Sequence, residues 1–237
     1  ARMKFGSLLI FLFLCFIVSV SARTPFPMKP NGATYFLKKS ESPYLLEDNF
    51  VLAAKDTLKI EAGVVVQMGS LAKMLLNGTT EISGTSVNPV QFIPSDSSES
   101  WNGVHFISTT TPFSVKYLVL EKAFRNTVSH ADGIFEGTQF IDNYYGVRVN
   151  ASPKVIFKDC LFERNRFALS VASSKIEVEN LSIRRNVFGL YLEGGVEFVG
   201  SQAGIVENME ADIRHGSVAG GKERVPLSVW QRVETAF

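Results

Sequence analysis

The chain has few of the residues that mark several common protein classes. Only two of its 237 residues are cysteines, which excludes a disulfide framework. Its 24 Lys+Arg are balanced by 23 Asp+Glu without a basic block, which argues against a polybasic nucleic-acid binder. Apolar residues make up 46% of the sequence, enough to form a core, so disorder is excluded as well.

Motifs of common catalytic and cofactor sites are also missing from the sequence. It contains no His-Glu-x-x-His, Cys-x-x-Cys, Gly-x-Ser-x-Gly, P-loop or Rossmann fingerprint. The three histidines, His105, His130 and His215, lie far apart without metal-ligand spacing, so each is expected at the surface or in a turn. The motifs therefore predict no catalytic residue, no metal site and no cofactor.

Residues 1–22 have the pattern of a secretory signal peptide. Met3-Lys4 supplies a positive start, Leu8 to Val20 is a nearly unbroken apolar run, and Val20-Ser21-Ala22 offers a cleavage site. The run is shorter than the about 20 residues of a membrane span, so an uncleaved anchor is the less favoured alternative. Removing the two bases of this segment leaves 22 bases, 23 acids and the single cysteine Cys160. The prediction is a secreted, periplasmic or cell-surface protein without a membrane span in the mature chain.

The remaining sequence divides into a short leader and a long β-rich region. Residues 23–43 are rich in Pro, Lys and Ser and are predicted to be a leader or linker. From residue 44 onward, short β-type runs such as Val64-Val-Val-Gln-Met alternate with Gly, Asn, Ser and Asp. No stretch between residues 44 and 210 sustains the 3.6-residue apolar period of a long helix.

An internal repeat decides the predicted fold. Asn143, Asn165, Asn186 and Asn208 are spaced 22, 21 and 22 residues apart. Around each Asn, equivalent positions carry three alternating apolar pairs, and each pair marks a short strand with two inward side chains. Three short strands in about 22 residues, repeated in register, predict one coil of a parallel β-solenoid. The fourth copy departs from the pattern after its Asn and is expected to be the last coil or a transition.

Stacking of the coils about 4.8 Å apart would place equivalent residues in columns. The Asn column is predicted at a turn, where each amide bonds to the next Asn and to the backbone of its own turn. Small residues three positions after the Asn, such as Gly146 and Ala168, fit a tight bend. Cys160 falls in an inward column and is expected to act as a small buried apolar residue.

Part of the repeat also fits a leucine-rich repeat. Phe157, Cys160, Phe162, Asn165 and Phe167 match the signature L-x-x-L-x-L-x-x-N-x-L. Leucine-rich repeats, however, follow the Asn with a loop and a helical or irregular return. Here two further alternating pairs follow in most copies, so the β-solenoid is the favoured interpretation.

Several segments carry a further likeness. They are Thr57-Leu-Lys-Ile-Glu-Ala-Gly-Val-Val-Val, Gly84-Thr85 with Pro89-Val-Gln-Phe-Ile-Pro-Ser and Trp101-Asn-Gly-Val, and Phe162-x-x-Asn165-x-x-Ala168-Leu with its copies. They resemble exported bacterial right-handed parallel β-helix repeat proteins of the pectate-lyase-like superfamily. The resemblance implies an all-β, right-handed β-helix of about seven coils over residues 44–215. That family includes lyases, hydrolases, adhesins and coils without known activity, so the fold does not choose among them.

Charged residues accompany the Asn column. They are Asp142, Arg164, Arg185 and Glu207 one position before it, and Glu163 and Arg184 two positions before it. One interpretation is a site for an acidic sugar, because lyases of this fold use an Arg or Lys base and carboxylates that hold Ca²⁺. The favoured interpretation is a ladder of surface ion pairs, since the carboxylates that a metal needs stand at opposite ends of the column.

Two further columns are informative. Tyr145, Phe167 and Phe188 stand two positions after the Asn and are expected to stabilise the stack, while Tyr144 and Tyr191 are candidates for stacking on a sugar.

Ile134, Ile156 and Val199 should point outward, which suggests that another segment covers them. The candidates for this covering or capping segment are Tyr35-Phe36-Leu37 and residues 216–237, which contain Trp230. Alternatively, residues 216–237 begin a further segment.

The combined prediction is an exported scaffold or binding module, without enzymatic activity, that presents a long face to a glycan or a protein. The candidate binding residues are Asp142, Tyr144, Arg164, Arg184, Arg185 and Tyr191, beside the structural ladder Asn143, Asn165, Asn186 and Asn208. The alternative is a polysaccharide lyase or glycoside hydrolase that acts on an acidic polysaccharide, with Arg164 and Arg185 as the first positions to mutate. Ca²⁺ is expected only under that alternative, and no nucleic-acid partner is predicted.

Overall fold

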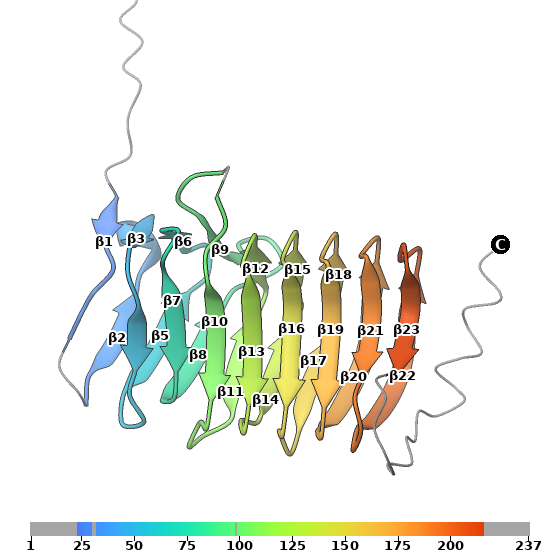
Figure 1. The fold of residues 1–237 in the computed structure, drawn as a ribbon. Helices are drawn as coiled ribbons and strands as arrows, with labels where there is room; N and C mark the ends of the chain where they lie inside the picture. Colours follow the sequence, from blue (N-terminus) through green and yellow to red (C-terminus); the bar gives the residue numbers. More distant parts are fainter. Residues whose placement is uncertain (1–22, 30–31, 98, 216–237) are drawn as a thin grey trace, which may run out of the picture.

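The computed structural model describes residues 23–29, 32–97 and 99–215, which form a right-handed parallel β-solenoid (Figure 1). Strands account for 58% and helices for 2% of the structure, and equivalent residues of successive turns lie about 22 residues apart. The solenoid has about nine turns, slightly more than the about seven that the resemblance implied. The predicted signal peptide and the predicted C-terminal cap lie outside the described residues.

Each turn contributes strands to three faces that run along the solenoid axis. The first face consists of β2 (Thr34–Leu37), β5 (Thr57–Glu61), β8 (Thr79–Ser83), β11 (Phe113–Lys116), β14 (Gly133–Glu136), β17 (Val155–Lys158) and the first halves of β20 (Lys175–Arg184) and β22 (Glu197–Val206). The second face consists of β1 (Thr24–Pro25), β3 (Tyr44–Leu46), β6 (Val65–Met68), β9 (Val90–Pro94), β12 (Leu118–Glu121), β15 (Gln139–Ile141), β18 (Leu161–Glu163) and the second halves of β20 and β22.

The third face is a separate eight-stranded sheet. It consists of β4 (Phe50–Leu52), β7 (Lys73–Leu76), β10 (Gly103–Ile107), β13 (Arg125–Ser129), β16 (Tyr145–Asn150), β19 (Phe167–Ala172), β21 (Phe188–Leu192) and β23 (Ala211–His215). The first two faces form one 15-stranded sheet because β20 and β22 continue from one face to the other. After the Asn, the chain therefore continues in β-strands rather than in the loop and helical or irregular return of a leucine-rich repeat. The leucine-rich alternative is wrong.

The solenoid begins earlier than residue 44, where the sequence analysis placed its start. In the segment expected to be a linker, β1 pairs with β3 and β2 pairs with β5, both in parallel. Tyr35 and Leu37 of β2 are buried in the core, while Phe36 between them points outward. The alternation of this strand is masked in the sequence by the surrounding Lys, Ser and Pro residues. A 3₁₀ turn, η1 (Lys39–Glu41), connects β2 to β3.

From β10 onward, each corner between successive faces carries a residue in the left-handed backbone conformation. Between the first and second faces these include Asp159 (φ 52°) and Asn180 (φ 52°), residue types that tolerate this conformation. The corresponding residues next to the Asn column include Arg164 and Arg185, both with φ 56°. The bend there is therefore set by the stacked coils rather than by local residue preference.

The interior is filled by stacked inward columns. Phe140 lies over Phe162 with ring centroids 4.5 Å apart and an interplanar angle of 15°. Cys160 is only 2% exposed and packs in the same core, as predicted. Burial raises the pKa of its thiol to about 12, so the group stays protonated and behaves as an apolar residue.

None of the described helical segments has the length and apolarity that crossing a bilayer requires.

Candidate functional site

The four repeat asparagines form a continuous hydrogen-bonded ladder at one corner of the solenoid. The Nδ2 of Asn143 donates to Oδ1 of Asn165 at 3.0 Å, and the same bond follows from Asn165 to Asn186 and from Asn186 to Asn208, both at 2.9 Å. Each acceptor Oδ1 also receives the backbone N–H of the preceding Asn. This corner, between the second and third faces, is called the Asn corner below.

The ladder differs in one respect from the sequence prediction. The Nδ2 of Asn165 donates to the Phe140 carbonyl of the preceding coil at 2.9 Å, rather than to its own turn. Among the four, only Asn186 also donates to the backbone of its own turn, to the Arg184 carbonyl at 2.9 Å. The asparagines therefore tie neighbouring coils together, because nearly every bond crosses from one coil to the next.

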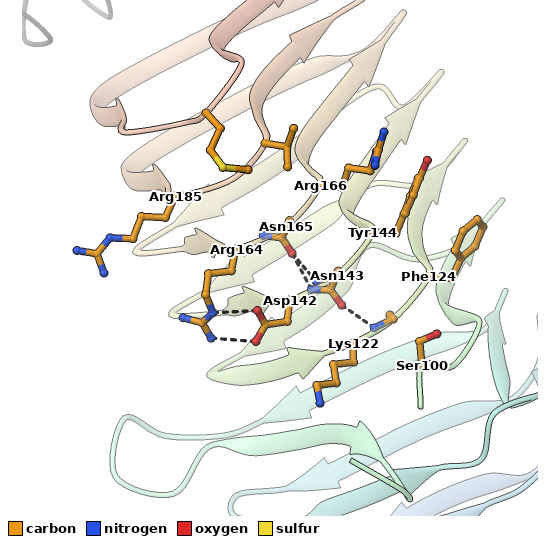
Figure 2. Close-up of a pocket in the computed structure, with 13 residues that line it drawn as sticks. Ser100, Lys122, Phe124, Asp142, Asn143, Tyr144, Arg164, Asn165, Arg166 and Arg185 are labelled. Carbon is orange, nitrogen blue, oxygen red and sulfur yellow. Dashed lines mark hydrogen bonds and ion pairs between the residues drawn. The ribbon is translucent and has the colours of Figure 1, made fainter. Parts of the chain in front are cut away.

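A shallow groove of about 560 Å³ lies outside the Asn corner and runs along the axis (Figure 2). Its floor is the corner itself, at Asn143 and Asn165. One wall is charged, and it is formed by Lys122, Asp142, Arg164 and Arg185. The other wall is largely apolar, and it is formed by Phe124, Tyr144, Arg166, Val187 and Met209. Each wall is one column of the repeat, directly before or directly after the Asn column.

On the charged wall, Arg164 and Asp142 form a bidentate ion pair. Nε and Nη2 of Arg164 donate to the two carboxylate oxygens of Asp142 at 2.8 and 2.9 Å. Figure 2 shows both side chains on the same side of the corner. The hydrogen bond to Asp142 raises the pKa of the Arg164 guanidinium, so its charged form is favoured further.

Glu163 connects the remaining arginines of this wall to the second face. Its Oε2 lies 3.2 Å from Nη1 of Arg164, and its Oε1 lies 3.2 Å from Nε of Arg184 and 3.5 Å from Nη1 of Arg185. The Arg184 contact has an ion-pair distance without hydrogen-bond geometry. Arg185 also reaches Glu207, with 3.4 Å between Nε and Oε2. The charged residues thus neutralise one another in a ladder of ion pairs.

The apolar wall is built on two exposed aromatic rings. Phe124 and Tyr144 are stacked with centroids 5.0 Å apart, and they are 49% and 39% exposed. The Arg166 guanidinium lies 5.4 Å from the centroid of the Tyr144 ring. The sequence analysis missed Phe124 because Ala123 stands in place of the Asn in that coil. Continuing the repeat one coil toward the N-terminus would have found it.

Two predicted binding residues lie away from this groove. Arg184 sits on the second face beside Glu163. Tyr191 belongs to the third face and borders a second cavity of about 370 Å³ with Arg148, Ser170 and Arg214. The structure therefore brings Asp142, Tyr144, Arg164 and Arg185 together but separates Arg184 and Tyr191 from them.

His105 was expected at the surface or in a turn, and this expectation is wrong. It lies in β10 on the third face, 8% exposed, beside a cavity of about 600 Å³ that also contacts Lys73 and Arg125. Burial, followed by the charges of Arg125 and Lys73, lowers the pKa of His105 to about 4. Its imidazole is therefore neutral near pH 7. A period-2 strand pattern places His105 at an outward position and does not reveal that the residue is buried there.

The acidic residues of the Asn corner do not fit a calcium ion. Ca²⁺ takes six to eight oxygen ligands, whereas the carboxylates of Asp142, Glu163 and Glu207 each face an arginine. Within the described part of the chain, no three His, Cys, Asp or Glu residues are grouped so that they could hold a metal ion.

No known protein family, curated protein or solved structure matches the chain. The fold and its surfaces define a class, a parallel β-solenoid with an axial groove at an asparagine ladder.

Proposed function

We propose that the chain is an exported β-helix scaffold that binds a glycan along the groove of the Asn corner, without catalysing a reaction on it. The observation that carries this proposal is the exposed pair Phe124 and Tyr144 on the apolar wall. The exposed apolar surface of these two stacked rings suits the CH groups of a sugar, while the polar side chains opposite suit its hydroxyl groups. The N-terminal signal pattern and the likeness to exported pectate-lyase-like β-helix proteins support export.

The Asn ladder makes the groove suitable for a long ligand. Its buried amides hold successive coils in one register, so the two walls are fixed before a ligand arrives. A preformed site costs less conformational entropy on binding than a flexible one. A linear polymer aligned with the axis would contact several successive coils of the groove.

The chemistry of the arginines argues against the enzymatic alternative. A lyase needs a base that gives up its proton before it attacks substrate. Asp142 instead raises the pKa of Arg164 through two hydrogen bonds, and Arg185 faces Glu163 and Glu207. Incubation with acidic polysaccharides and Ca²⁺ tests this directly. Release of unsaturated uronides, seen as ultraviolet absorbance, would overturn the non-enzymatic proposal.

Affinity electrophoresis tests the binding site. The protein should be retarded in a native gel that contains its polysaccharide, and Tyr144→Ala and Phe124→Ala should each abolish most of the retardation. Phe36→Ala is the matched control, because Phe36 is 44% exposed on the first face. Unretarded migration across a polysaccharide panel, or wild-type retardation of Tyr144→Ala, would refute the proposed groove.

A further inference from the structure

The first and third faces differ in whether their basic side chains have acidic partners. On the first face, all of them do. Its strands carry four lysines, and every one of them forms an ion pair with a glutamate of a neighbouring coil. The pairs are Lys59–Glu81 at 3.0 Å, Lys116–Glu136 at 3.3 Å, Lys158–Glu179 at 3.3 Å and Lys175–Glu197 at 3.3 Å. Each lysine of the first face is therefore neutralised by a glutamate of the adjacent coil.

The third face has the opposite arrangement. Its eight strands contain four Lys or Arg residues, which are Lys73, Arg125, Arg148 and Arg214. Among the residues that the structure describes, none of these four has a carboxylate within ion-pair distance. The single acid in these strands, Asp212, accepts the backbone N–H and the Nδ2 of Asn208 and so ends the ladder.

The four bases border the two cavities of this face in pairs. Lys73 and Arg125 border the cavity of about 600 Å³, and Arg148 and Arg214 border the cavity of about 370 Å³. One acid lies at each cavity, Asp48 at the first and Glu193 at the second, so each keeps an excess of positive charge.

The register distributes the four bases along the axis in two neighbouring columns, Lys73 and Arg125 in one and Arg148 and Arg214 in the other. They stand on β7, β13, β16 and β23, which are connected through six successive strand pairings. At about 4.8 Å per strand, the bases span about 29 Å along the axis. A ligand that contacts all of them is therefore elongated and lies across the strands.

Hydroxyl groups and aromatic edges fill the space between the bases. In one outward column, Ser170 and Tyr191 stand between Arg148 and Arg214. In the other, Tyr145 and Phe188 stack on either side of Phe167 with centroids 4.9 and 4.8 Å apart. Because the rings stack along the axis, they present edges rather than faces to the solvent, and aromatic edges carry partial positive charge.

His105 gives a second sign of the positive potential on this face. Burial is the main cause of its lowered pKa, and the charges of Arg125 and Lys73 lower it further. The same potential that disfavours the imidazolium would attract an anion.

We propose that the third face binds a linear anionic glycan that lies along the solenoid axis and carries carboxylate or sulfate groups. Its acidic groups pair with the four bases, and its hydroxyl groups face Ser170 and Tyr191. DNA fits this face poorly, because it carries one charge per about 1.7 Å, whereas four bases span about 29 Å. An acidic peptide lacks the hydroxyl groups that the column between the arginines would satisfy.

This site adjoins the groove of the Asn corner at Phe124, which borders both the groove and the cavity of about 600 Å³, so the variants that distinguish the two proposals leave Phe124 unchanged. Arg148→Gln/Arg214→Gln changes the third face and leaves Tyr144 in place. Tyr144→Ala changes the groove and leaves the four bases in place.

The test compares two double variants that each remove two positive charges. Arg148→Gln/Arg214→Gln alters the third face, and Lys59→Gln/Lys116→Gln alters the first face by the same net charge. Binding is measured by calorimetry to heparin as the sulfated probe, polygalacturonate as the carboxylated probe, neutral dextran and polyglutamate. Circular dichroism and thermal unfolding verify that both variants keep the solenoid.

Wild-type protein should bind at least one of the two anionic glycans, with affinity that falls as salt rises, and the preferred probe identifies the acidic group. The third-face variant should bind at least tenfold more weakly, while the first-face variant should stay within twofold of wild type. Equal losses in both variants would show unspecific attraction and overturn the site. Failure to bind either anionic glycan, or equally tight binding of polyglutamate or dextran, would overturn the ligand class.

Discussion

The first and third faces of the solenoid are built from the same repeat but handle charge in opposite ways. On the first face, a lysine in one coil meets a glutamate in the next, as in Lys116–Glu136. On the third face, Arg148 instead has Thr127 and Ser170 as its neighbours in the preceding and following coils. Equal spacing thus yields one face whose lysines are all paired with glutamates and one basic face whose lysine and arginines are not. The overall charge of +1 conceals this difference, because it sums over all faces.

The largest expected effect concerns the register that both faces share. Asn165→Ala would leave the N–H of Asn143 and the carbonyl of Phe140 without their buried partners. The unfolding free energy should fall by about 3 kcal/mol or more, because each unsatisfied buried group costs about 1–3 kcal/mol. Chemical denaturation measures this. Asn150→Ala, on the third face and outside the ladder, is the control. An equal loss of unfolding free energy in that variant would show that the ladder does not stabilise the solenoid specifically.

The next effect is specific to the third face and depends on pH. The folded-state pKa of His105 is about 4, below the ordinary 6.5, so the unfolded chain takes up this proton first as pH falls. The contribution of neutral His105 to the free energy of unfolding is therefore fully present above pH 6.5. It is lost as the pH falls toward 4, by about 3 kcal/mol. His105→Gln should remove this part of the pH dependence in denaturation curves between pH 7.5 and 4. Parallel pH profiles for the two proteins would contradict the account.

A third change would convert the third face toward the arrangement of the first. Thr127 is the strand partner of Arg148 in the adjacent coil, so Thr127→Glu would give that arginine an ion-pair partner. Affinity for the anionic glycan should fall about tenfold, which corresponds to about 1.4 kcal/mol. Ser114→Glu adds the same charge on the first face and should have a much smaller effect. If both variants bind equally well, the location of the charge is irrelevant.

The smallest effect belongs to the first face itself. Lys116 and Glu136 form a solvent-exposed pair, and such pairs contribute about 0–1 kcal/mol. A double-mutant cycle with Lys116→Ala and Glu136→Ala should give a coupling energy below about 1 kcal/mol. A coupling of several kcal/mol would mean that these pairs hold the coils together, in place of the core and the Asn ladder.

The fold was predictable from the sequence where the repeat is regular. The asparagines between Asn143 and Asn208 revealed coil length, strand order and the inward position of Cys160. The first coils were harder to detect, because Met74 pairs with Val104 across 30 residues, whereas Phe106 pairs with Val128 across 22. A loop between β9 and β10 breaks the spacing there, and those coils lack the Asn.

The charges near the Asn column were partly predictable as well. Equivalent positions placed Asp142 beside Arg164, and the structure shows them paired. Arg148 and Arg214 do not stand next to an Asn of the column, so the charges beside that column do not predict their neighbours. Their lack of partners depends on which residues occupy the adjacent coils, and a sum over the whole sequence does not reveal it.

Hydroxyl-radical footprinting tests the contrast between the faces most directly. With saturating anionic glycan bound, Tyr145, Phe167 and Tyr191 on the third face should be protected from labelling. Phe36, exposed on the first face, should be labelled as in the free protein. Protection of Phe36 with unchanged labelling of the third-face aromatics would contradict the assignment of the basic third face as the binding surface.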